Sequence, residues 1–357
     1  MFVNTNNCPS LRVRLVNFSH TQKEDSEKFE IFSQERFIEE KLSPEGRESL
    51  FGHPPPFTNE EITAKAEKCR KQTGVVDRLF FNGEIEEMAG IAATKAIEKA
   101  RIKYGEIDMI IGASNTGPGY PSLADRVKNY LYKHNGSTIK SSAVCFDVQE
   151  ACTVGSIGIF IGWSMIRSGS AKTVLVVLAE KATELAKTDN WKASNLFSDA
   201  AAAVVLSSSL HEQFSFFDMN SYPEEGNLDS IYKHKEELFQ QDGPKVHRFV
   251  GGQVIEDLDR AVKTADINPK NINHLFTHQP SGKTVSLLQE KIKSTWKAYK
   301  GTFHQDFAGG NTSSVSTLAL ISKKIESGQI KDQDLIIVCT FGAGLSVGCY
   351  GFYYSMY

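Results

Sequence analysis

The sequence predicts an α/β protein built from two similar halves whose sheets enclose buried helices. Each half closes with the same order of helix, apolar strand, loop and apolar strand. The helix of the first closing unit is the segment 152–169, CTVGSIGIFIGWSMIRSG, which is apolar on nearly every helical face and is typical of a helix buried on all sides. We place the division near residue 210, which gives an N-terminal half at 1–210 and a C-terminal half at 211–357.

Composition narrows the class of protein. The chain has 357 residues, 40% of them hydrophobic, and a net charge of −3, so it can bury a large core. No run of Lys and Arg reaches the length of a basic arm, which argues against a nucleic-acid partner. The N-terminus lacks the layout of a secretory signal, and no apolar stretch is long enough to span a bilayer. We therefore expect a soluble, cytoplasmic protein without a membrane partner.

The N-terminal half begins with an alternating segment at 11–18, which predicts a half-buried strand. Residues 20–60 are rich in Glu, Lys, Ser and Pro, and the stretch GHPPPFTNEE interrupts regular structure, so we expect a surface excursion there. A helix follows from Asn59 to Gly74. The other elements expected in this half are helices at 84–104, 121–134 and 152–169, and strands at 107–114, 141–151, 173–182 and 201–209, with a polar excursion at 183–198.

The C-terminal half ends in a glycine-rich hairpin. Before it we expect strands at 214–219 and 271–279 and helices at 249–266, 283–296 and 313–327. The closing segment FGAGLSVGCYG (341–351) could be mistaken for a dinucleotide fingerprint, but only six residues follow Gly351. A nicotinamide site needs a further helix and strand, so we predict no cofactor and assign the glycines to a close passage of backbone along a thioester.

Cys152 is the candidate nucleophile among the six cysteines, which lack any CxxC pair. It follows a predicted strand and opens a helix, and unpaired N–H groups at a helix N-terminus favour a thiolate. Its backbone N–H could also serve a developing oxyanion. The alternative is a small buried cysteine, which is what we expect of Cys145, Cys339 and Cys349.

His278 and Asn311 are the other two candidates. His278 ends a predicted strand, where a side chain commonly faces a cleft, although a hydrogen-bonded structural histidine is the alternative. Asn311 follows two glycines at a turn into a helix, so it either caps that helix or offers an amide to a substrate carbonyl. His274 lies four residues before His278, but on a strand this spacing does not build a metal site, and we predict no metal.

These motifs occur in an order that resembles a known family. DVQEAC with a glycine-rich helix behind it, FSDAAAAVVL, THQPSGK, GGNTSS and FGAGLSVG are similar to segments of β-ketoacyl-acyl-carrier-protein synthase III and its relatives in the thiolase superfamily. The resemblance runs from about Thr73 to the C-terminus. It implies the thiolase-like layered αβαβα fold and an acyltransferase that forms carbon–carbon bonds.

The resemblance also implies roles for individual residues. The family's catalytic triad falls on Cys152, His278 and Asn311, and its oxyanion hole on the backbone N–H groups of Cys152 and Ala343. The nucleophile would accept an acyl group from a thioester of acyl carrier protein or coenzyme A. The histidine and asparagine would stabilise the enolate formed when a malonyl or β-ketoacyl extender loses carbon dioxide.

Further positions follow from the same comparison. Tyr120 matches a loop that crosses a dimer interface into the partner's acyl pocket, which implies a homodimer. Lys283 matches a basic residue that docks the carrier protein, and Arg248 lies near the same mouth. Glu150, two residues before the nucleophile, replaces the family's usual small residue and is either a second base for cyclisation or a glutamate paired at the interface.

Three departures point to a specialised member. Lys68 and Gln72 stand where the family grips adenine with Trp and Arg, which favours a carrier-protein donor over free coenzyme A. FSDAAAA replaces a glycine-rich loop, and residues 20–60 have no counterpart in the housekeeping enzyme. We expect a ketosynthase or ketosynthase-cyclase of polyketide-like or fatty-acid-like secondary metabolism, making resorcinol-, dione- or pyrone-type products.

Two other functions compete with condensation. The acyl group on the cysteine could pass to an alcohol or amine, or the chain could be a non-catalytic subunit of a heterodimeric synthase. The intact His–Asn pair favours condensation, because stabilising an enolate uses both donors. The retained nucleophile argues against the subunit.

Overall fold

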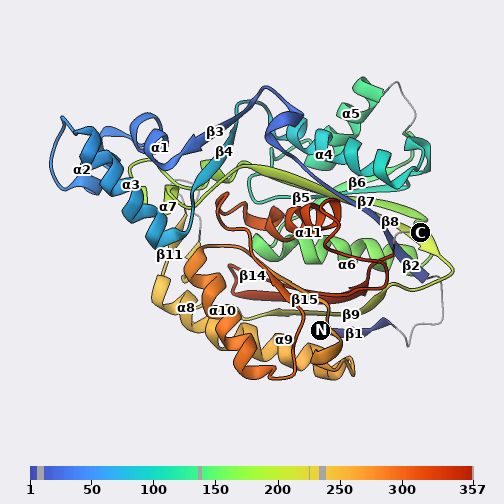
Figure 1. Cartoon of the computed structure of the whole chain (residues 1–357). Coiled ribbons are helices and arrows are strands. Elements are labelled where there is room, and N and C mark those ends of the chain that lie inside the picture. The colour runs from blue at the N-terminus through green and yellow to red at the C-terminus, as the bar shows by residue number, and fades with distance from the viewer. Residues whose placement is uncertain (6–11, 136–138, 225, 233–238, 356–357) are drawn as a thin grey trace.

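Two β-sheets face each other across a layer of buried helices, and further helices cover their outer faces (Figure 1). The computed structural model describes residues 1–5, 12–135, 139–224, 226–232 and 239–355. One sheet has the strand order β2-β8-β7-β5-β6 and the other β1-β9-β15-β14-β12-β13. The predicted αβαβα layering is therefore confirmed.

The strand bounds follow the predicted segments in both sheets, except that two short strands, at 2–4 and 302–304, lie outside them. The first sheet contains β2 (Arg12–His20), β5 (Met109–Ala113), β6 (Val144–Val148), β7 (Thr173–Glu180) and β8 (Ala200–Ser209). The second contains β1 (Phe2–Asn4), β9 (Phe214–Ser221), β12 (His274–Thr277), β13 (Thr302–His304), β14 (Leu335–Gly342) and β15 (Ser346–Tyr353). β1 pairs with β9, so the start of the chain contributes to the sheet of the second half.

The helices fall into one inner and two outer layers. The inner layer consists of α6 (Val154–Arg167) and α11 (Ser316–Glu326). The first sheet is covered by α4 (Ile85–Ala100) and α5 (Leu123–Asn135). The second sheet is covered by α8 (Gly243–Gly251), α9 (Gln253–Thr264) and α10 (Gly282–Thr295). No helix in the described ranges combines the length and apolarity that crossing a bilayer requires.

Glycines let α6 lie against the first sheet. A Cβ at Gly155 would come within 2.7 Å of Leu178, and one at Gly162 within 2.8 Å of Leu206. These glycines lie seven residues apart and so share one helical face. Larger residues on this face would push the helix away from β7 and β8, and the N-terminal end of the helix carries Cys152.

The helix predicted at 249–266 is two helices. α8 begins earlier, where Asp242 accepts a hydrogen bond from the backbone N–H of Lys245. It ends at Gly252, whose backbone (φ −115°, ψ −91°) is not helical, and α9 starts one residue later. Two consecutive glycines, 251 and 252, lower the cost of this break.

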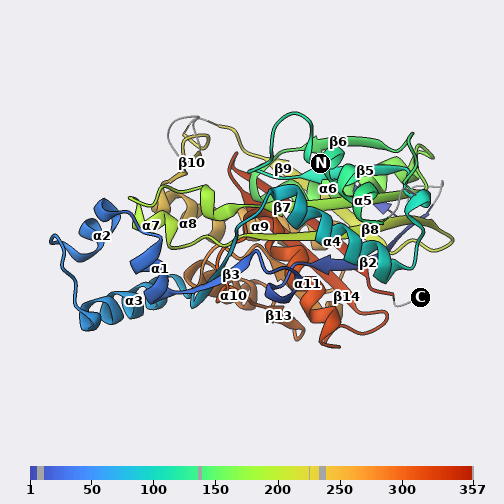
Figure 2. The same cartoon turned by 90° about the horizontal axis from the view of Figure 1, so that it is seen from above.

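The surface excursion predicted at 20–60 is wrong for most of its length. It contains β3 (Phe29–Ser33), α1 (Gln34–Glu40) and α2 (Pro44–Phe51), which pack with α3 (Asn59–Thr73) at one end of the molecule (Figures 1 and 2). β3 pairs with β4 (Asp77–Phe81). The segment has its own core of Phe32, Phe37, Ile38, Leu42, Leu50, Phe51, Ile62, Ala66 and Cys69. The segment 20–60 is rich in charged residues, and its apolar side chains are separated by the polar outer faces of short helices. Its composition therefore does not indicate this core.

Candidate active site

A cavity of about 700 Å³ gathers most of the residues predicted to carry chemistry. Cys152, His278, Asn311, Ala343 and Glu150 all line it. They come from both halves of the chain. Much of the remaining wall is apolar and is formed by Leu185, Leu196, Phe197, Ile231, Phe239, Val246, Phe249, Phe341 and Leu345. The cavity can therefore hold an elongated apolar group beside a thiol.

A sharp turn presents Cys152 to this cavity. Residues Ala151–Thr153 form a single 3₁₀ turn between β6 and α6, and Ala151 has a left-handed backbone with φ 44°. The end of β14 lies directly against this turn, since a Cβ at Gly342 would come within 2.7 Å of the backbone nitrogen of Cys152. The glycine-rich hairpin thus serves close backbone approach, as its sequence indicates.

The sulfur of Cys152 is held as a thiol. Burial raises its pKa to about 12, the charge of Glu180 adds to the rise, and a contact of 3.8 Å with Ser313 Oγ opposes it. Desolvation therefore opposes the thiolate that we expect the helix N-terminus to favour.

Of the three cysteines expected to be small buried residues, two are buried and one is not. Cys339 and Cys349 are buried partners across β14 and β15, as predicted for small apolar residues. Cys145 is only half-buried. Cys8 lies outside the described residues.

His278 leaves β12 directly into the cavity wall. Its backbone N–H donates to the carbonyl of Cys339 (3.1 Å), which ties it to β14, and its Nδ1 lies 2.8 Å from Ser316 Oγ. Burial lowers its pKa to about 3, so the imidazole is neutral at physiological pH. With Nδ1 engaged, Nε2 is the ring nitrogen left for a ligand.

The amide of Asn311 is oriented by its own loop. Its backbone is held from two sides, by Leu196 O (2.7 Å) and by the N–H of Ser198 (3.0 Å). Its side-chain Oδ1 accepts a hydrogen bond from the N–H of Ser313 (2.9 Å). Because the acceptor is used locally, the two Nδ2 hydrogens remain as donors for a group in the cavity. The sequence offers helix capping as the alternative role of Asn311, but the caps of the next two helical segments are Thr312 and Val315, so the bond of Asn311 lies within its own turn.

A buried glutamate that the sequence analysis does not single out connects the loops that carry Cys152 and Asn311. Glu180, at the end of β7, accepts hydrogen bonds from the backbone N–H of Asn115, from Asn115 Nδ2 (2.8 Å) and from Ser314 Oγ (2.5 Å). Asn115 Nδ2 also lies 3.0 Å from Ala151 O and 3.2 Å from Ser313 Oγ. Burial raises the pKa of Glu180. Its only signal is a charge closing the apolar strand TVLVVLAE.

The remaining predicted residues divide between the cavity and the surface. Glu150 faces the cavity beside Cys152 and makes no hydrogen bond or ion pair with its side chain in the described part of the chain. Tyr120 is fully exposed and lies outside the cavity of its own chain. Lys283 and Arg248 are exposed on α10 and α8, next in sequence to the lining residues Thr284 and Phe249.

The histidine pair 274 and 278 is split by the fold. His274 Nδ1 lies 2.9 Å from His304 Nε2, and its Nε2 lies 2.9 Å from Asp334, whereas His278 faces the cavity. Within the ranges that the structure describes, no cluster of three His, Cys, Asp or Glu side chains could hold a metal ion.

Sequence comparison places the chain near one enzyme family. Residues 146–223 match the family model 3-oxoacyl-(acyl-carrier-protein) synthase III, and residues 262–354 match the model of its C-terminal part. The β-ketoacyl-(acyl-carrier-protein) synthase III of Bacillus pumilus is 28% identical over 80% of this chain and 89% of its own length. The enzyme of the same name from Listeria innocua is 29% identical over 79% and 88%.

Solved structures share the whole fold. The 3-oxoacyl-(acyl carrier protein) synthase III of Pseudomonas aeruginosa superposes with a TM-score of 0.78 at 19% identity, over 96% of this chain and 98% of its own. A priming β-ketosynthase of a polyketide pathway gives 0.78 at 19% identity, over 97% and 98%. OleA of Xanthomonas campestris gives 0.77 at 17%, over 97% and 98%.

The raised pKa of Cys152 predicts how its alkylation depends on pH. Only the thiolate reacts with iodoacetamide, and with a pKa of about 12 the thiolate fraction rises about tenfold per pH unit from pH 7 to 10. The rate of modification of the peptide carrying Cys152, followed by mass spectrometry, should rise without levelling. A small-molecule thiol in the same buffers is the control and should level near pH 9. Levelling of Cys152 below pH 8 would instead demonstrate a stabilised thiolate.

Proposed function

We propose that this chain, a β-ketoacyl-acyl-carrier-protein synthase III-like condensing enzyme of the thiolase superfamily, is acylated on Cys152 and performs decarboxylative Claisen condensation. In the first half-reaction the acyl group moves from a donor thioester to the sulfur. In the second, an extender thioester loses carbon dioxide, its carbanion attacks the acyl carbon, and the bond to sulfur breaks. The observation that carries this proposal is the meeting of a thiol, a neutral imidazole and an oriented amide in one cavity.

The two polar side chains suit enolate stabilisation. The Nδ2 group of Asn311 is free to donate, and a neutral His278 can donate from Nε2 without adding a charge to a buried site. Two donors converging on a thioester carbonyl lower the energy of the enolate more than that of the ground state. The backbone N–H groups of Cys152 and Ala343 would hold the oxyanion formed at the acyl carbon.

The substrate is proposed to be carried on a protein. The exposed cations Lys283 and Arg248 flank residues of the cavity wall and would dock an acidic acyl carrier protein, consistent with the printed names of the relatives. Lys68 and Gln72 are exposed on α3 and offer no aromatic platform for adenine, which disfavours free coenzyme A. The apolar wall favours an acyl chain over a short polar starter.

Acylation and decarboxylation can be separated by variants. Wild-type protein incubated with a panel of acyl-carrier-protein thioesters should gain the acyl mass, and Cys152→Ala should not. His278→Ala and Asn311→Ala should still gain the acyl group, His278→Ala more slowly because the thiol proton loses its acceptor. Both should release carbon dioxide from a malonyl thioester about 100-fold more slowly, since each removes one donor. Intact mass and carbon dioxide release are the measurements.

Two results would replace this proposal by its alternatives. Acylation followed by transfer to an alcohol or amine, without loss of carbon dioxide, would establish an acyltransferase. An unchanged mass with every thioester tested would support a non-catalytic subunit.

Glu150 supports a second activity, cyclisation of the condensed product. Its carboxylate faces the cavity two residues from the nucleophile and has no partner there among the described residues. An unpaired carboxylate beside a β-ketoacyl intermediate can remove a proton from an activated carbon. This would produce the resorcinol-, dione- or pyrone-type compounds of polyketide-like metabolism.

The product profile tests this role. Glu150→Gln keeps the shape of the side chain and removes its basicity, so acylation should persist while cyclic products give way to linear ones, as read by mass spectrometry of the extract. Glu150→Asp, which retains a carboxylate, is the matched control and should keep cyclic products detectable. An unchanged ratio of cyclic to linear products in Glu150→Gln would remove the idea.

A homodimer is proposed through the free edge of the first sheet. β6 pairs only with β5, and its first residue, Val144, is 52% exposed. Half-buried apolar side chains of α6, including Phe160 and Met165, add to this surface. A two-fold axis would pair β6 with the same strand of a second copy. The fully exposed Tyr120 would then reach the second copy's acyl pocket.

Size measurement checks the edge pairing. Light scattering should give twice the chain mass of 39.6 kDa for the wild type. Val144→Lys should shift the protein toward the monomer because it places a charge on the apolar edge strand that would pair with the second copy. Leu210→Lys, at an apolar residue that is 85% exposed between β8 and β9, is the control and should remain dimeric. A monomeric wild type would contradict the proposal.

A further inference from the structure

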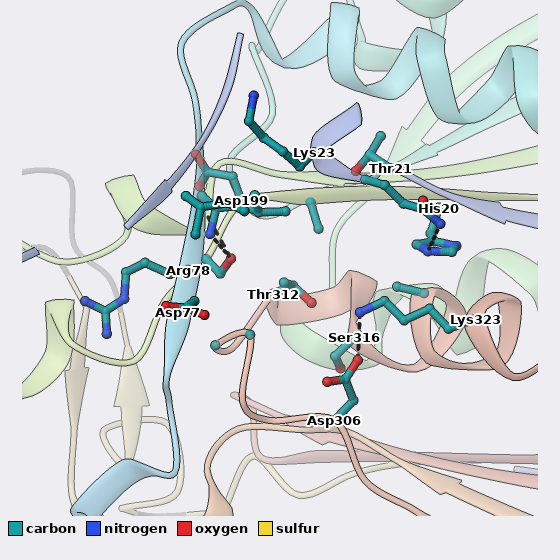
Figure 3. Close-up of a pocket in the computed structure, with 18 of the residues that line it drawn as sticks. His20, Thr21, Lys23, Asp77, Arg78, Asp199, Asp306, Thr312, Ser316 and Lys323 are labelled. Atoms are coloured by element: carbon teal, nitrogen blue, oxygen red, sulfur yellow. Dashed lines mark hydrogen bonds and ion pairs between the residues drawn. The ribbon is translucent and has the colours of Figure 1, made fainter. Parts of the chain in front are cut away.

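A second cavity of about 470 Å³ shares two chain segments with the active-site cavity; Figure 3 shows its lining. The first shared segment leads into α11: Asn311 and Ser313 line the active-site cavity, whereas Gly310, Thr312 and Ser316 line the second one. The second shared segment precedes β8, with Phe197 on one side and Ser198 on the other. At these segments the wall between the cavities is therefore one backbone thick.

Ser316 connects the two sides of this wall. Its Oγ lies 2.8 Å from Nδ1 of His278, accepts a long hydrogen bond from the N–H of Gln279 (3.4 Å), and belongs to the lining of the second cavity. A hydroxyl has one donor and two acceptor positions. With one acceptor position used by Gln279, the hydroxyl can either donate to Nδ1 or accept from it. Both neutral tautomers of His278 are therefore accommodated.

The second cavity is polar enough to hold water. His20, Asp199 and Thr312 face it, and the ion pair between Lys323 and Asp306 (2.7 Å) lies on the same side as Ser316 (Figure 3). A water needs two to four polar partners and far less volume than this cavity offers. When Nδ1 carries the proton, the Ser316 hydroxyl hydrogen can turn toward such a water.

The two half-reactions require a proton to leave and then to return. Acylation breaks the S–H bond of Cys152, and condensation breaks the C–S bond and restores the thiol. Between the two steps His278 must carry hydrogen on Nε2 to donate to the extender carbonyl. One neutral ring therefore has to change tautomer between the half-reactions.

We propose that Ser316 is a positioning residue that switches the tautomer of His278 by relaying protons between its Nδ1 and water in the second cavity. The inference rests on the proposed condensation. During acylation Nε2 takes the thiol proton, directly or through one water, while the Nδ1 proton passes to Ser316 and the serine proton passes to water. The thiolate released from the donor takes a proton from solvent in the active-site cavity.

Condensation runs the relay backwards. The extender carboxylate leaves as carbon dioxide, the new carbon–carbon bond forms, and the sulfur departing from the acyl carbon takes the Nε2 proton. Nδ1 then takes the proton of Ser316, which is replaced from water. After one cycle one proton has left to water in the second cavity and one has returned from it. Each half-reaction therefore leaves His278 in the tautomer that the next half-reaction uses.

The test combines rates with the tautomer itself. Ser316→Ala should slow acylation and condensation about 100-fold, the lower end of a general acid–base contribution, and Ser316→Thr should restore both to within about threefold because it keeps the hydroxyl. In ¹⁵N NMR of histidine-labelled wild type, with the His278 signal assigned from His278→Gln, the proton should move from Nδ1 to Nε2 on acylation. In Ser316→Ala it should not move.

Ser322→Ala is the matched control. Ser322 lies on the same helix and its Oγ is 3.0 Å from Nδ1 of another buried histidine, His20. His20 lines the second cavity, so this variant removes an equivalent bond at that cavity without touching His278. Its rates and the His278 signal should equal those of the wild type.

Three results would overturn the relay: equal rates in Ser316→Ala and Ser322→Ala, an unchanged His278 tautomer on acylation of the wild type, or no rescue by Ser316→Thr. The proposed function fails separately, if no thioester acylates the wild type. Resting-state spectra then still decide the role of Ser316, because identical His278 signals in wild type and Ser316→Ala would exclude control of the tautomer.

Discussion

The buried carboxylate of Glu180 is the point on which the site depends. It accepts hydrogen bonds from Asn115 in the first half of the chain and from Ser314 in the second. Asn115 in turn reaches the carbonyl of Ala151, at the turn that presents Cys152. Losing this acceptor would leave several buried donors unsatisfied, each at a cost of about 1–3 kcal/mol. The two halves are thus joined at the turn that presents Cys152 to the cavity.

Burial around this junction decides the chemistry of the neighbouring groups. It holds Cys152 as a thiol and His278 as a neutral imidazole, so the resting site carries neither a thiolate nor an imidazolium. Neither of these two groups carries a charge that would activate the sulfur, although the carboxylate of Glu150 lines the same cavity. In the proposed reaction proton transfer accompanies the bond changes, which makes the partner of Nδ1 as important as the atoms that face the substrate.

Local patterns predict the core well and the tertiary details poorly. Apolar periodicity locates the strands of both sheets and the buried helix after Cys152, because these elements are buried along their whole length. The order of motifs locates Cys152, His278 and Asn311. By contrast, the core of α1, α2 and α3 forms only when Phe32 and Phe37 meet residues of α3 far along the chain. Glu180 and Ser316 are recognisable only from what lies across the fold from them, and desolvation of a thiol has no signature in sequence.

The segment 20–60, whose structure its composition does not indicate, also forms part of the wall of the second cavity. The approach to β3, residues 20–24, lines the second cavity, and Ile31 and Asp77 add to its wall from β3 and β4. Asp199 anchors the same region, because its carboxylate accepts from the backbone N–H of Phe81 and from Thr183. Changes in this segment can therefore alter the size and hydration of the space that Ser316 faces without touching the residues around the substrate. Because the wall is one backbone thick, variation behind it acts on the tautomer of His278, whereas variation in front acts on the acyl chain. The two properties can change independently while Cys152, His278 and Asn311 stay the same.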